Sequence, residues 1–272
     1  MTTLRSMPSS VVHVVTGAGR GMGLACARRL ASAGGHLVVA DVSPIDPALF
    51  GAEHVTTVVC DITSDDQVRE LARVSGAIGP VRSLVHAAGV SPTMGDARLM
   101  FAVDLAGSAR MVAAFEPLMA PGGAGVLFAS MAAHLIATAD AGSVGDVLAD
   151  PLAPGAEDSF VAADEIAGES SKAYGWAKRG VIELARRSAV PWGRRGARIN
   201  SISPGTIDTP MGRQEQDAQP MMAVLLELTP MARIGSDDDI VSAVSFLLSD
   251  QASYVTGVDL LVDGGVVAAI TS

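Results

Sequence analysis

The chain has 272 residues, 49% of them apolar, and a formal net charge of −10. That length and apolar content can bury one large core, and no linker or repeat divides the sequence, so we expect a single α/β domain. With this acidic net charge, the chain has no basic stripe to bind a phosphate backbone, so no nucleic-acid partner is predicted. Its apolar runs are shorter than the roughly 18 residues that span a bilayer, so no membrane span is predicted.

The first half of the chain alternates short apolar strands with amphipathic helices that begin at Ser or end at Gly. In chain order the predicted elements are strand Val11–Thr16, helix Met22–Ala33, strands His36–Asp41 and Val55–Cys60, a helix from about Ser64, strand Val81–His86, a long helix from about Asp96 to Met119, and strand Val126–Ser130.

An acidic segment separates this half from a second series of elements. These are a helix from about Ser171 to Trp192, strand Arg198–Ser203, a helical stretch Met221–Leu228, helix Asp237–Leu248 and strand Val258–Val262. Strand and helix in alternation predict a parallel sheet covered by helices on both faces. Such a sheet binds its ligands at the carboxyl ends of its strands.

Both cysteines, Cys26 and Cys60, lie in apolar segments, and the first ten residues lack the long apolar run of a secretory signal. These features are typical of a reducing compartment, so we expect a cytoplasmic protein with free thiols. No metal centre is predicted.

The acidic segment, residues 131–170, has no Lys or Arg. Its Gly, Pro, Ala and Asp content predicts a loop with short helices. Because it joins the end of the strand at Ser130 to the helix that carries Tyr174, we expect it to lie near the substrate mouth as a lid, the alternative being a solvated surface loop. Its acids, expected to face solvent, are Asp140, Asp146, Asp150, Glu157, Asp158, Asp164, Glu165 and Glu169. Its apolar residues, expected to pack on the main body, are Leu148, Leu152, Phe160, Val161 and Ile166.

The sequence TGAGRGMG, from Thr16 to Gly23, follows the first predicted strand. Glycines at a sharp strand-to-helix turn let a pyrophosphate approach backbone N–H groups at the positive end of a helix. The spacing differs from the G-x-G-x-x-G of two-domain dinucleotide-binding enzymes. Taken alone, the glycines leave open a tight turn that binds no ligand.

Tyr174 and Lys178 lie four residues apart on a predicted helix, so the phenol and the ammonium share one face. This spacing also occurs in ordinary amphipathic helices. A tyrosine with its usual pKa of about 10 is a poor base at neutral pH, but a nearby lysine and the positive nicotinamide of NAD favour the phenolate. Combined with the phosphate turn, the pair predicts hydride transfer between a nicotinamide and a carbonyl or alcohol.

The order of these motifs resembles that of the short-chain dehydrogenase/reductase family. Thr16–Gly23 matches the family's T-G-x-x-x-G-x-G, and Tyr174 with Lys178 matches its Y-x-x-x-K. The other matching segments, each after a predicted strand, are Asp41, Asp61-Ile62, Ala87-Ala88-Gly89, Ser130, Pro204–Thr209 and Asp263–Gly265. The resemblance covers nearly the whole chain outside residues 131–170. It implies a Rossmann-type doubly wound parallel sheet, with residues 1–272 forming one NAD(P)-binding domain.

The resemblance also implies how NAD is held. Asp61-Ile62 would hold the adenine, Ala88-Gly89 would line the adenosine side, and Ile207 and Thr209 would hold the nicotinamide amide and phosphate. Taken singly, Asp61 is also explained as a helix-start acid, Gly89 as a turn residue and Pro204-Gly205 as a strand terminator. The full set of implied cofactor residues is Gly17, Gly19, Arg20, Gly21, Met22, Gly23, Asp41, Asp61, Ile62, Ala87, Ala88, Gly89, Tyr174, Lys178, Pro204, Gly205, Ile207 and Thr209.

Asp41 and Arg20 make opposite predictions about the cofactor. A carboxylate at the end of the second strand can accept both ribose hydroxyls of NAD, whereas a 2′-phosphate about 4 Å away would be repelled by on the order of 4 kcal/mol at an effective dielectric near 20. Arg20 is a basic residue of the kind that accompanies NADP in some relatives. We favour NAD because the Asp41 carboxylate would occupy the ribose site itself.

By the same resemblance, four residues carry the reaction. Tyr174 would be the acid–base, Lys178 would lower the pKa of Tyr174 and hold the ribose, and Ser130 would place the substrate oxygen. Asp104 stands where relatives carry an Asn whose backbone carbonyl holds a water linked to the lysine. His86 is a second departure, because HAAG replaces the common NNAG.

The predicted activity is NAD-dependent interconversion of a secondary alcohol and a ketone. The alternatives are an NADP-dependent carbonyl reductase and a catalytically silent, nucleotide-sensing relative, which would be expected to have lost Ser130, Tyr174 or Lys178. Apolar residues predicted at the substrate site favour a bulky substrate such as a steroid or terpenoid over a polar sugar or an acyl-carrier thioester. They are Met94, Leu135, Met211 and Met221 to Leu226. A homodimer or homotetramer is expected, formed through the helices that start near Asp96 and Ser171.

Overall fold

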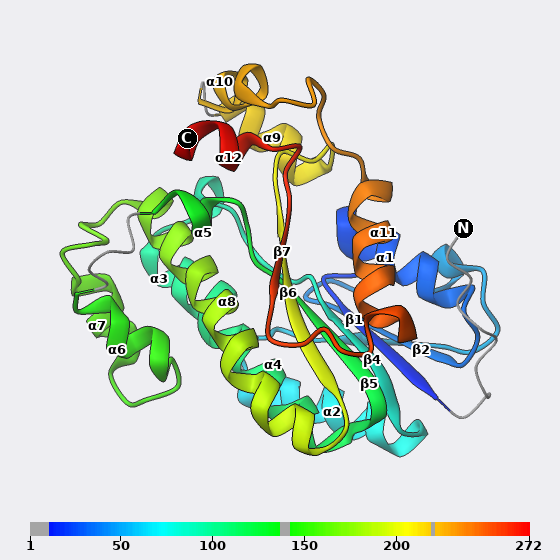
Figure 1. The fold of residues 1–272 in the computed structure, drawn as a ribbon. Helices are drawn as coiled ribbons and strands as arrows, with labels where there is room; N and C mark the ends of the chain where they lie inside the picture. The colour runs from blue at the N-terminus through cyan, green and yellow to red at the C-terminus, as the bar shows by residue number, and fades with distance from the viewer. Residues whose placement is uncertain (1–10, 137–141, 219–220) are drawn as a thin grey trace.

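A seven-stranded parallel sheet of order β3-β2-β1-β4-β5-β6-β7 forms the centre of the protein (Figure 1). The computed structural model describes residues 11–136, 142–218 and 221–272, and the side chains of 215–223 lie outside this description. The strands are β1 Val12–Thr16, β2 His36–Asp41, β3 Val55–Val59, β4 Val81–His86, β5 Met119–Phe128, β6 Arg198–Pro204 and β7 Asp259–Val262. The predicted doubly wound parallel sheet is confirmed.

Helices cover both faces of the sheet because alternate strand residues point to opposite sides. Val14 of β1 belongs to the core beneath one helical layer, and its neighbour Val15 belongs to the core on the other face. The first layer contains α2 Asp65–Ile78, α4 Ser108–Phe115 and α8 Ser170–Arg194. The second contains α1 Gly21–Ala31 and α11 Asp237–Leu248. In the described part of the chain, none of the helices is long and apolar enough to cross a membrane.

The helix predicted from about Asp96 to Met119 is present as one continuous helical run, but it is not a regular α-helix throughout. The structure has a short α3 Ala97–Leu99, a π-helical segment η3 Met100–Gly107, and α4, which ends at Phe115. The run then ends in one 3₁₀ turn, η4 Glu116–Leu118, where Pro117 has no backbone N–H to bond to the preceding helical turn. As a result β5 begins at Met119, earlier than predicted, with a register shift before Ala124.

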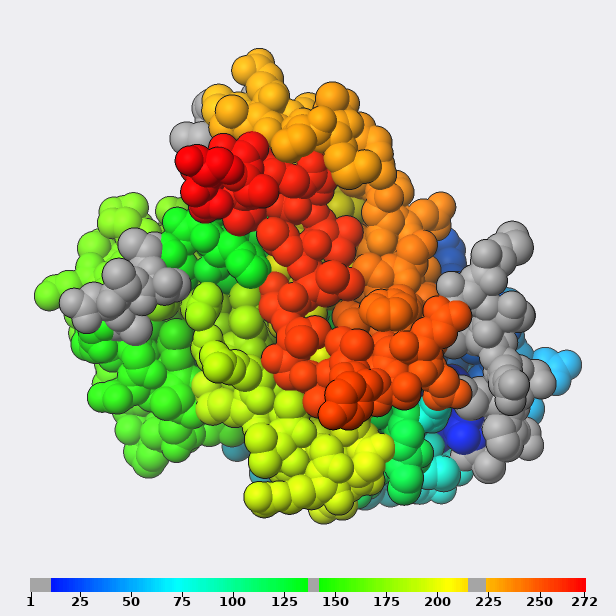
Figure 2. Space-filling view, viewed as in Figure 1, coloured from blue at the N-terminus to red at the C-terminus, as the bar shows by residue number. Residues whose placement is uncertain are grey.

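The carboxyl ends of the strands are covered by a cap of short helices, at the top of Figure 1. The cap contains α5 Ala132–Leu135, α9 Pro210–Ala218, α10 Met221–Leu228 and α12 Val266–Thr271. We did not predict α9 or α12. Met131 and Leu225 pack there against Val266 and Val267, which fixes α10 and α12 above the end of β5. Figure 2 shows the C-terminal segment, in red, crossing the front surface between α8 and α11.

The acidic segment forms two further helices, α6 Val144–Ala149 and α7 Ala156–Ala162, on the outer side of α8 (Figure 1). Phe160 and Ile166 are completely buried there, in a third core that also contains Phe101 and Trp176. This core explains why the segment folds onto the main body. Leu152 departs from the prediction, because it is 44% exposed in the turn between the two helices.

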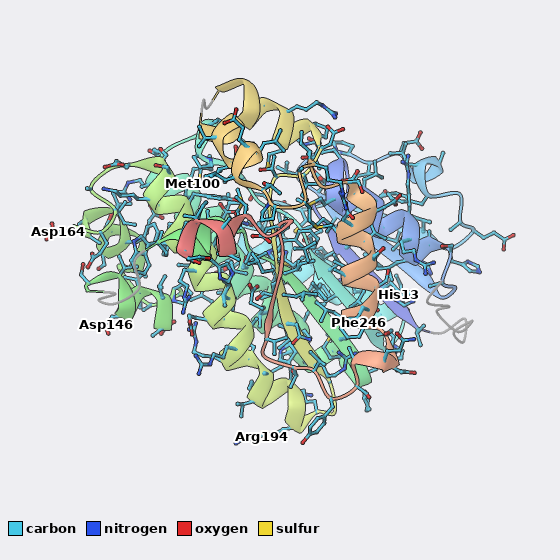
Figure 3. The ribbon with its side chains drawn as sticks, turned by 45° about the horizontal axis from the view of Figure 1, so that its top comes forward. His13, Met100, Asp146, Asp164, Arg194 and Phe246 are labelled. Atoms are coloured by element: carbon cyan, nitrogen blue, oxygen red, sulfur yellow. The ribbon has the colours of Figure 1, made fainter. Side chains whose placement is uncertain are left out.

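The acids of this segment mostly face solvent, as predicted. Asp146 and Asp164 are exposed, and Figure 3 places both at the outer edge of the molecule. Glu157 and Asp158 form ion pairs with Arg98 of α3, and the distances are 2.5 and 2.8 Å. Asp140 lies outside the described residues.

Candidate active site

The glycine turn follows β1 and begins α1. Gly17 has a φ of +66°, which favours glycine, and a Cβ placed on it would lie 2.6 Å from the backbone nitrogen of Ala88. A Cβ on Gly23 would lie 2.1 Å from the carbonyl oxygen of Gly17. These contacts hold the turn tightly against Ala87 and Ala88, so side chains are excluded and the N–H groups at the start of α1 stay accessible to a ligand.

Asp41 lies at the end of β2, beside this turn. Its Oδ2 accepts a hydrogen bond of 3.0 Å from the Gly19 N–H, and its Oδ1 accepts one of 3.3 Å from the Ser43 N–H. Arg20 is exposed. The structure therefore brings the predicted ribose acid to the phosphate turn.

Several other predicted cofactor residues border the turn or have structural contacts of their own. A Cβ on Gly21 would lie 3.6 Å from Thr209, whose Oγ1 accepts a hydrogen bond from the Gly212 N–H. Asp61 binds Thr63 through Oδ1, in an Asx-type turn. The side chain of Ile62 is buried in the core, so only its backbone is free to meet a ligand.

The predicted segment after β6 crosses the same edge of the sheet. The Pro204 carbonyl accepts a hydrogen bond from the Met131 N–H, next to Ser130. Gly205 packs against Asp263, where a Cβ would lie 2.6 Å from the Asp263 Cα. Ile207 is buried in the core below.

Tyr174 and Lys178 occupy successive turns of α8, as predicted. The Lys178 Nζ lies 5.7 Å from the centre of the Tyr174 ring and donates a hydrogen bond of 3.0 Å to the Phe128 carbonyl at the end of β5. Lys178 is 5% exposed, whereas Tyr174 is half-buried. Ser130 follows β5, and its Oγ accepts a hydrogen bond from the Ala132 N–H.

Asp104 is completely buried in η3 and pairs directly with Lys178, at 3.0 Å between Oδ1 and Nζ. The same Oδ1 accepts a hydrogen bond of 3.2 Å from the Val90 N–H. Burial raises the pKa of Asp104 above its ordinary value, and the ammonium of Lys178 opposes that rise. The sequence left open whether Asp104 perturbs Lys178, and the structure shows that its carboxylate contacts the lysine directly.

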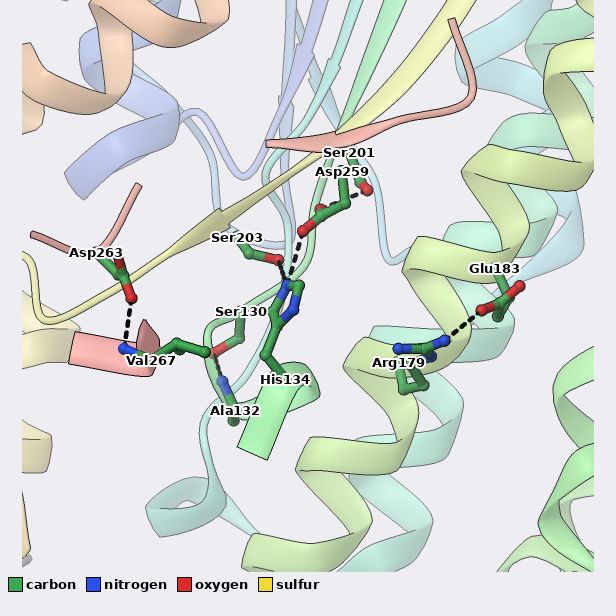
Figure 4. A network of polar contacts seen from close by, with 10 residues as sticks. All are labelled: Ser130, Ala132, His134, Arg179, Glu183, Ser201, Ser203, Asp259, Asp263 and Val267. Atoms are coloured by element: carbon green, nitrogen blue, oxygen red, sulfur yellow. Dashed lines mark hydrogen bonds and ion pairs between the residues drawn. The ribbon is translucent and has the colours of Figure 1, made fainter. Parts of the chain in front are cut away.

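Two histidines near the site had no predicted role. His86 lies in β4 and hydrogen-bonds to Thr16 and Ser108. His134 lies in α5, four residues after Ser130, and its Nε2 is 2.8 Å from Asp259 Oδ2 and 3.3 Å from Ser203 Oγ (Figure 4). The departure of HAAG from the common NNAG drew attention to His86, whereas no motif in the sequence includes His134.

The apolar residues predicted at the substrate site differ in their exposure. Met94 and Leu135 are 39% and 37% exposed, and Met211 is half-buried. Of the predicted residues in α10, Leu225 is buried and Leu226 is half-buried, and the side chains of Met221, Met222 and Ala223 lie outside the described residues.

Comparisons with known proteins agree with this architecture. Residues 17–144 and 158–267 match the family model described as enoyl-(acyl carrier protein) reductase, and the gap falls in the acidic segment. The chain is 34% identical over 228 residues to the short-chain dehydrogenase/reductase bsc3 of Alternaria brassicicola, with 80% of each chain covered. It is 31% identical over 264 residues to the L-tagatose-forming galactitol 2-dehydrogenase of Cereibacter sphaeroides, with 92% of each covered.

Among solved structures, the 3-alpha-hydroxysteroid dehydrogenase from Pseudomonas sp. B-0831, complexed with NADH, superposes with a TM-score of 0.77. It is 29% identical, and the match covers 96% of this chain and 98% of that one. The chain therefore belongs to the short-chain dehydrogenase/reductase family, as the motifs predicted.

Proposed function

We propose that this protein is an NAD-dependent enzyme that interconverts a secondary alcohol and a ketone. The observation that carries the proposal is the position of Lys178, which contacts the Tyr174 ring and hydrogen-bonds to the end of the strand that leads to Ser130. A silent nucleotide-binding relative would have no need to keep a buried ammonium next to a phenol, because burying a charge costs free energy.

The residues present fit a nicotinamide dinucleotide. The turn at Gly17, Gly19 and Gly23 has no room for side chains, which is what close approach of a pyrophosphate requires. The Asp41 carboxylate beside it suits the ribose hydroxyls of NAD, and its charge disfavours a 2′-phosphate. Arg20, exposed at the same turn, supports NADP as the second candidate.

The chain's own residues account for the proton transfer. In the oxidation direction the Tyr174 phenolate takes the proton of the substrate hydroxyl, and in reduction the phenol returns it. Lys178 stabilises the phenolate by its positive charge, and Ser130 orients the substrate oxygen through a hydrogen bond. Bound NAD supplies the acceptor for the hydride from the carbinol carbon.

Two substrate classes have support. The exposed Met94 and Leu135 favour a bulky apolar alcohol, and a 3-alpha-hydroxysteroid dehydrogenase is among the similar structures. The similarity to a galactitol 2-dehydrogenase supports a polyol instead. We favour the apolar class because methionine side chains adapt to large apolar ligands.

The test is a screen of secondary alcohols with NAD and with NADP, followed by the absorbance of the reduced cofactor. Steroid, terpenoid and polyol alcohols form the panel. We expect turnover with NAD and a higher kcat/KM for the apolar members. Cofactor binding without turnover of any member would support the silent relative.

A further inference from the structure

His86, Ser108 and Asp104 form a buried chain of hydrogen bonds beneath the candidate active site. The Thr16 Oγ1 is 2.7 Å from His86 Nδ1, and His86 Nε2 is 3.1 Å from Ser108 Oγ. Ser108 Oγ donates over 2.6 Å to the carbonyl oxygen of Asp104. All three hydrogen bonds connect buried groups that are distant from solvent.

The chemistry of these groups fixes where the hydrogens are. Ser108 has one hydroxyl hydrogen and gives it to the Asp104 carbonyl, so its oxygen must accept from His86 Nε2–H. His86 Nδ1 then accepts from the Thr16 hydroxyl. Burial, with a further contribution from the charge of Lys178, lowers the pKa of His86 to about 3, which agrees with a neutral ring. This chain of hydrogen bonds therefore holds the backbone of Asp104 from one side. The Ser108 hydroxyl and both ring nitrogens of His86 all have hydrogen-bond partners in it.

The other side of Asp104 faces Lys178. Oδ1 contacts the ammonium, and Oδ2 is buried without a hydrogen-bond partner among the described residues. Gly89 makes room for this contact, because a Cβ there would lie 2.8 Å from Oδ1 and 3.1 Å from Nζ. An asparagine would bring no negative charge to the lysine, so the carboxylate changes the electrostatics of the Tyr174–Lys178 pair.

We propose that Asp104 acts through its carboxylate as the direct counter-ion of Lys178, that His86 and Ser108 are positioning residues for Asp104, and that this unit sets the pH at which Tyr174 ionises. A negative charge near the phenol makes the phenolate harder to form. The protein therefore balances Lys178, which favours the phenolate, with Asp104, which opposes it. The importance of this balance for catalysis rests on the proposed function, whereas the effect of the two charges on the ionisation of Tyr174 does not.

The chain allows a test that needs no substrate. It contains two tyrosines, and Tyr254 is fully exposed and distant from the site residues in the sequence. Tyr254→Phe leaves Tyr174 as the single phenol, so its ionisation can be followed in the cofactor-free protein by the absorption of the phenolate, with circular dichroism to show that the fold persists over the pH range. Asp104→Asn, which keeps the shape of the side chain, is then added to this background.

We expect Asp104→Asn to move the Tyr174 titration to lower pH by about one unit, as the loss of one partly screened charge several ångströms away predicts. His86→Asn and Ser108→Ala should each move it in the same direction by less. Because both interrupt the same chain, the double variant should shift no further than the larger single change. The matched control His54→Asn, an exposed histidine, should leave the titration in place.

The outcomes separate the inference from the proposed function. An unchanged titration in Asp104→Asn overturns the inference, since it would mean that the carboxylate brings no charge to the pair. A shift in Asp104→Asn with none in His86→Asn or Ser108→Ala overturns the positioning role. If the titration shifts but the acid limb of the kcat/KM profile for alcohol oxidation stays in place, the balance is real and Tyr174 is not the base in the reaction.

Discussion

Asp41 is the residue on which the proposed preference for NAD depends. Its carboxylate is held at the phosphate turn by the Gly19 N–H, so it cannot move away from an incoming 2′-phosphate without losing that hydrogen bond. Arg20 is exposed at the same turn. We therefore give Asp41 more weight than Arg20 in proposing NAD as the cofactor.

We predict that the protein has a higher kcat/KM with NAD than with NADP, and that Asp41→Ser narrows the preference by tenfold or more through the loss of the charge repulsion, roughly 1.4 kcal/mol or more. Steady-state kinetics with both cofactors measure it, with Asp46→Ser as an exposed control. A preference of the unchanged protein for NADP would show that Arg20 governs the choice.

At the residue scale, positions that depend on local periodicity could be predicted from the sequence, whereas contacts between distant residues could not. The spacing of Tyr174 and Lys178 follows from helical periodicity. The contact of Asp104 with Lys178 joins residues 74 positions apart, and the role of His134 depends on β7. No periodicity in the sequence predicts either contact.

At the scale of elements, α5 connects the two halves of the candidate active site. It follows Ser130, and Gly175, next to Tyr174, packs so closely that a Cβ would lie 2.8 Å from Ile136. On the other side His134 joins α5 to Asp259 of β7, whose Oδ1 accepts a hydrogen bond from Ser201 (Figure 4). We infer that this contact fixes Ser130 relative to Tyr174.

His134→Ala should therefore lower kcat by about tenfold, roughly 1.4 kcal/mol in the barrier, because Ser130 loses its fixed position. The affinity for NADH, measured by fluorescence, should stay unchanged. His54→Ala is the matched control. If His134→Ala lowers the melting temperature but leaves kcat intact, the contact serves stability alone.

The π-helical segment η3, within an otherwise continuous helix, shows a limit of sequence patterns at this scale. Its apolar spacing is compatible with a continuous helix, and only Pro117 marks an end. The π-helical turn at Asp104 is accompanied by the hydrogen bond from the Ser108 side chain to the Asp104 carbonyl, an interaction that a hydrophobic pattern does not record. The β-branched strands His36–Asp41 and Val81–His86 were predicted at their observed bounds, whereas the start of β5 was not.

At the scale of the whole molecule, the acidic segment covers helices that we expected to meet a second subunit. Phe160 and Ile166 fill the outer face of η3 and α8, where Phe101 and Trp176 are buried. We therefore propose that α6 and α7 determine how copies of this chain associate, in addition to the lid role expected for the segment.

Replacing residues 137–168 by a short glycine-containing loop should expose that apolar face and increase the number of subunits in solution. Light scattering after size-exclusion chromatography measures the change. The same variant tests the lid, since a higher KM for bulky apolar alcohols with unchanged subunit number would favour a lid and contradict the assembly role.

Two buried histidines predict how the stability of the whole molecule depends on pH. Burial lowers the pKa of His13 to about 4, and it lowers that of His86 to about 3. The unfolded chain binds protons on these residues from about pH 6.5 downward, before the folded protein does, so the free energy of unfolding should fall as the pH drops from 6.5 to 4. His13 alone contributes on the order of 3 kcal/mol to this loss.

Denaturant unfolding across this pH range checks the prediction. His13→Gln should flatten the pH dependence, although His13 also hydrogen-bonds to Ser83, so a lower stability at neutral pH is expected as well. If the free energy of unfolding of His13→Gln falls with pH as steeply as that of the unchanged protein, His13 is not the cause of the loss.

The central claim is that Tyr174, supported by Lys178, is the acid–base of an NAD-dependent oxidoreductase. The most direct measurement is turnover of Tyr174→Phe with NAD and the best alcohol of the screen, alongside NADH binding by fluorescence. The change removes the titrating oxygen and keeps the ring, so kcat should fall by about 10² to 10⁴ while NADH affinity stays near that of the unchanged protein. Retention of more than a tenth of the rate, with NADH still bound, would contradict the claim.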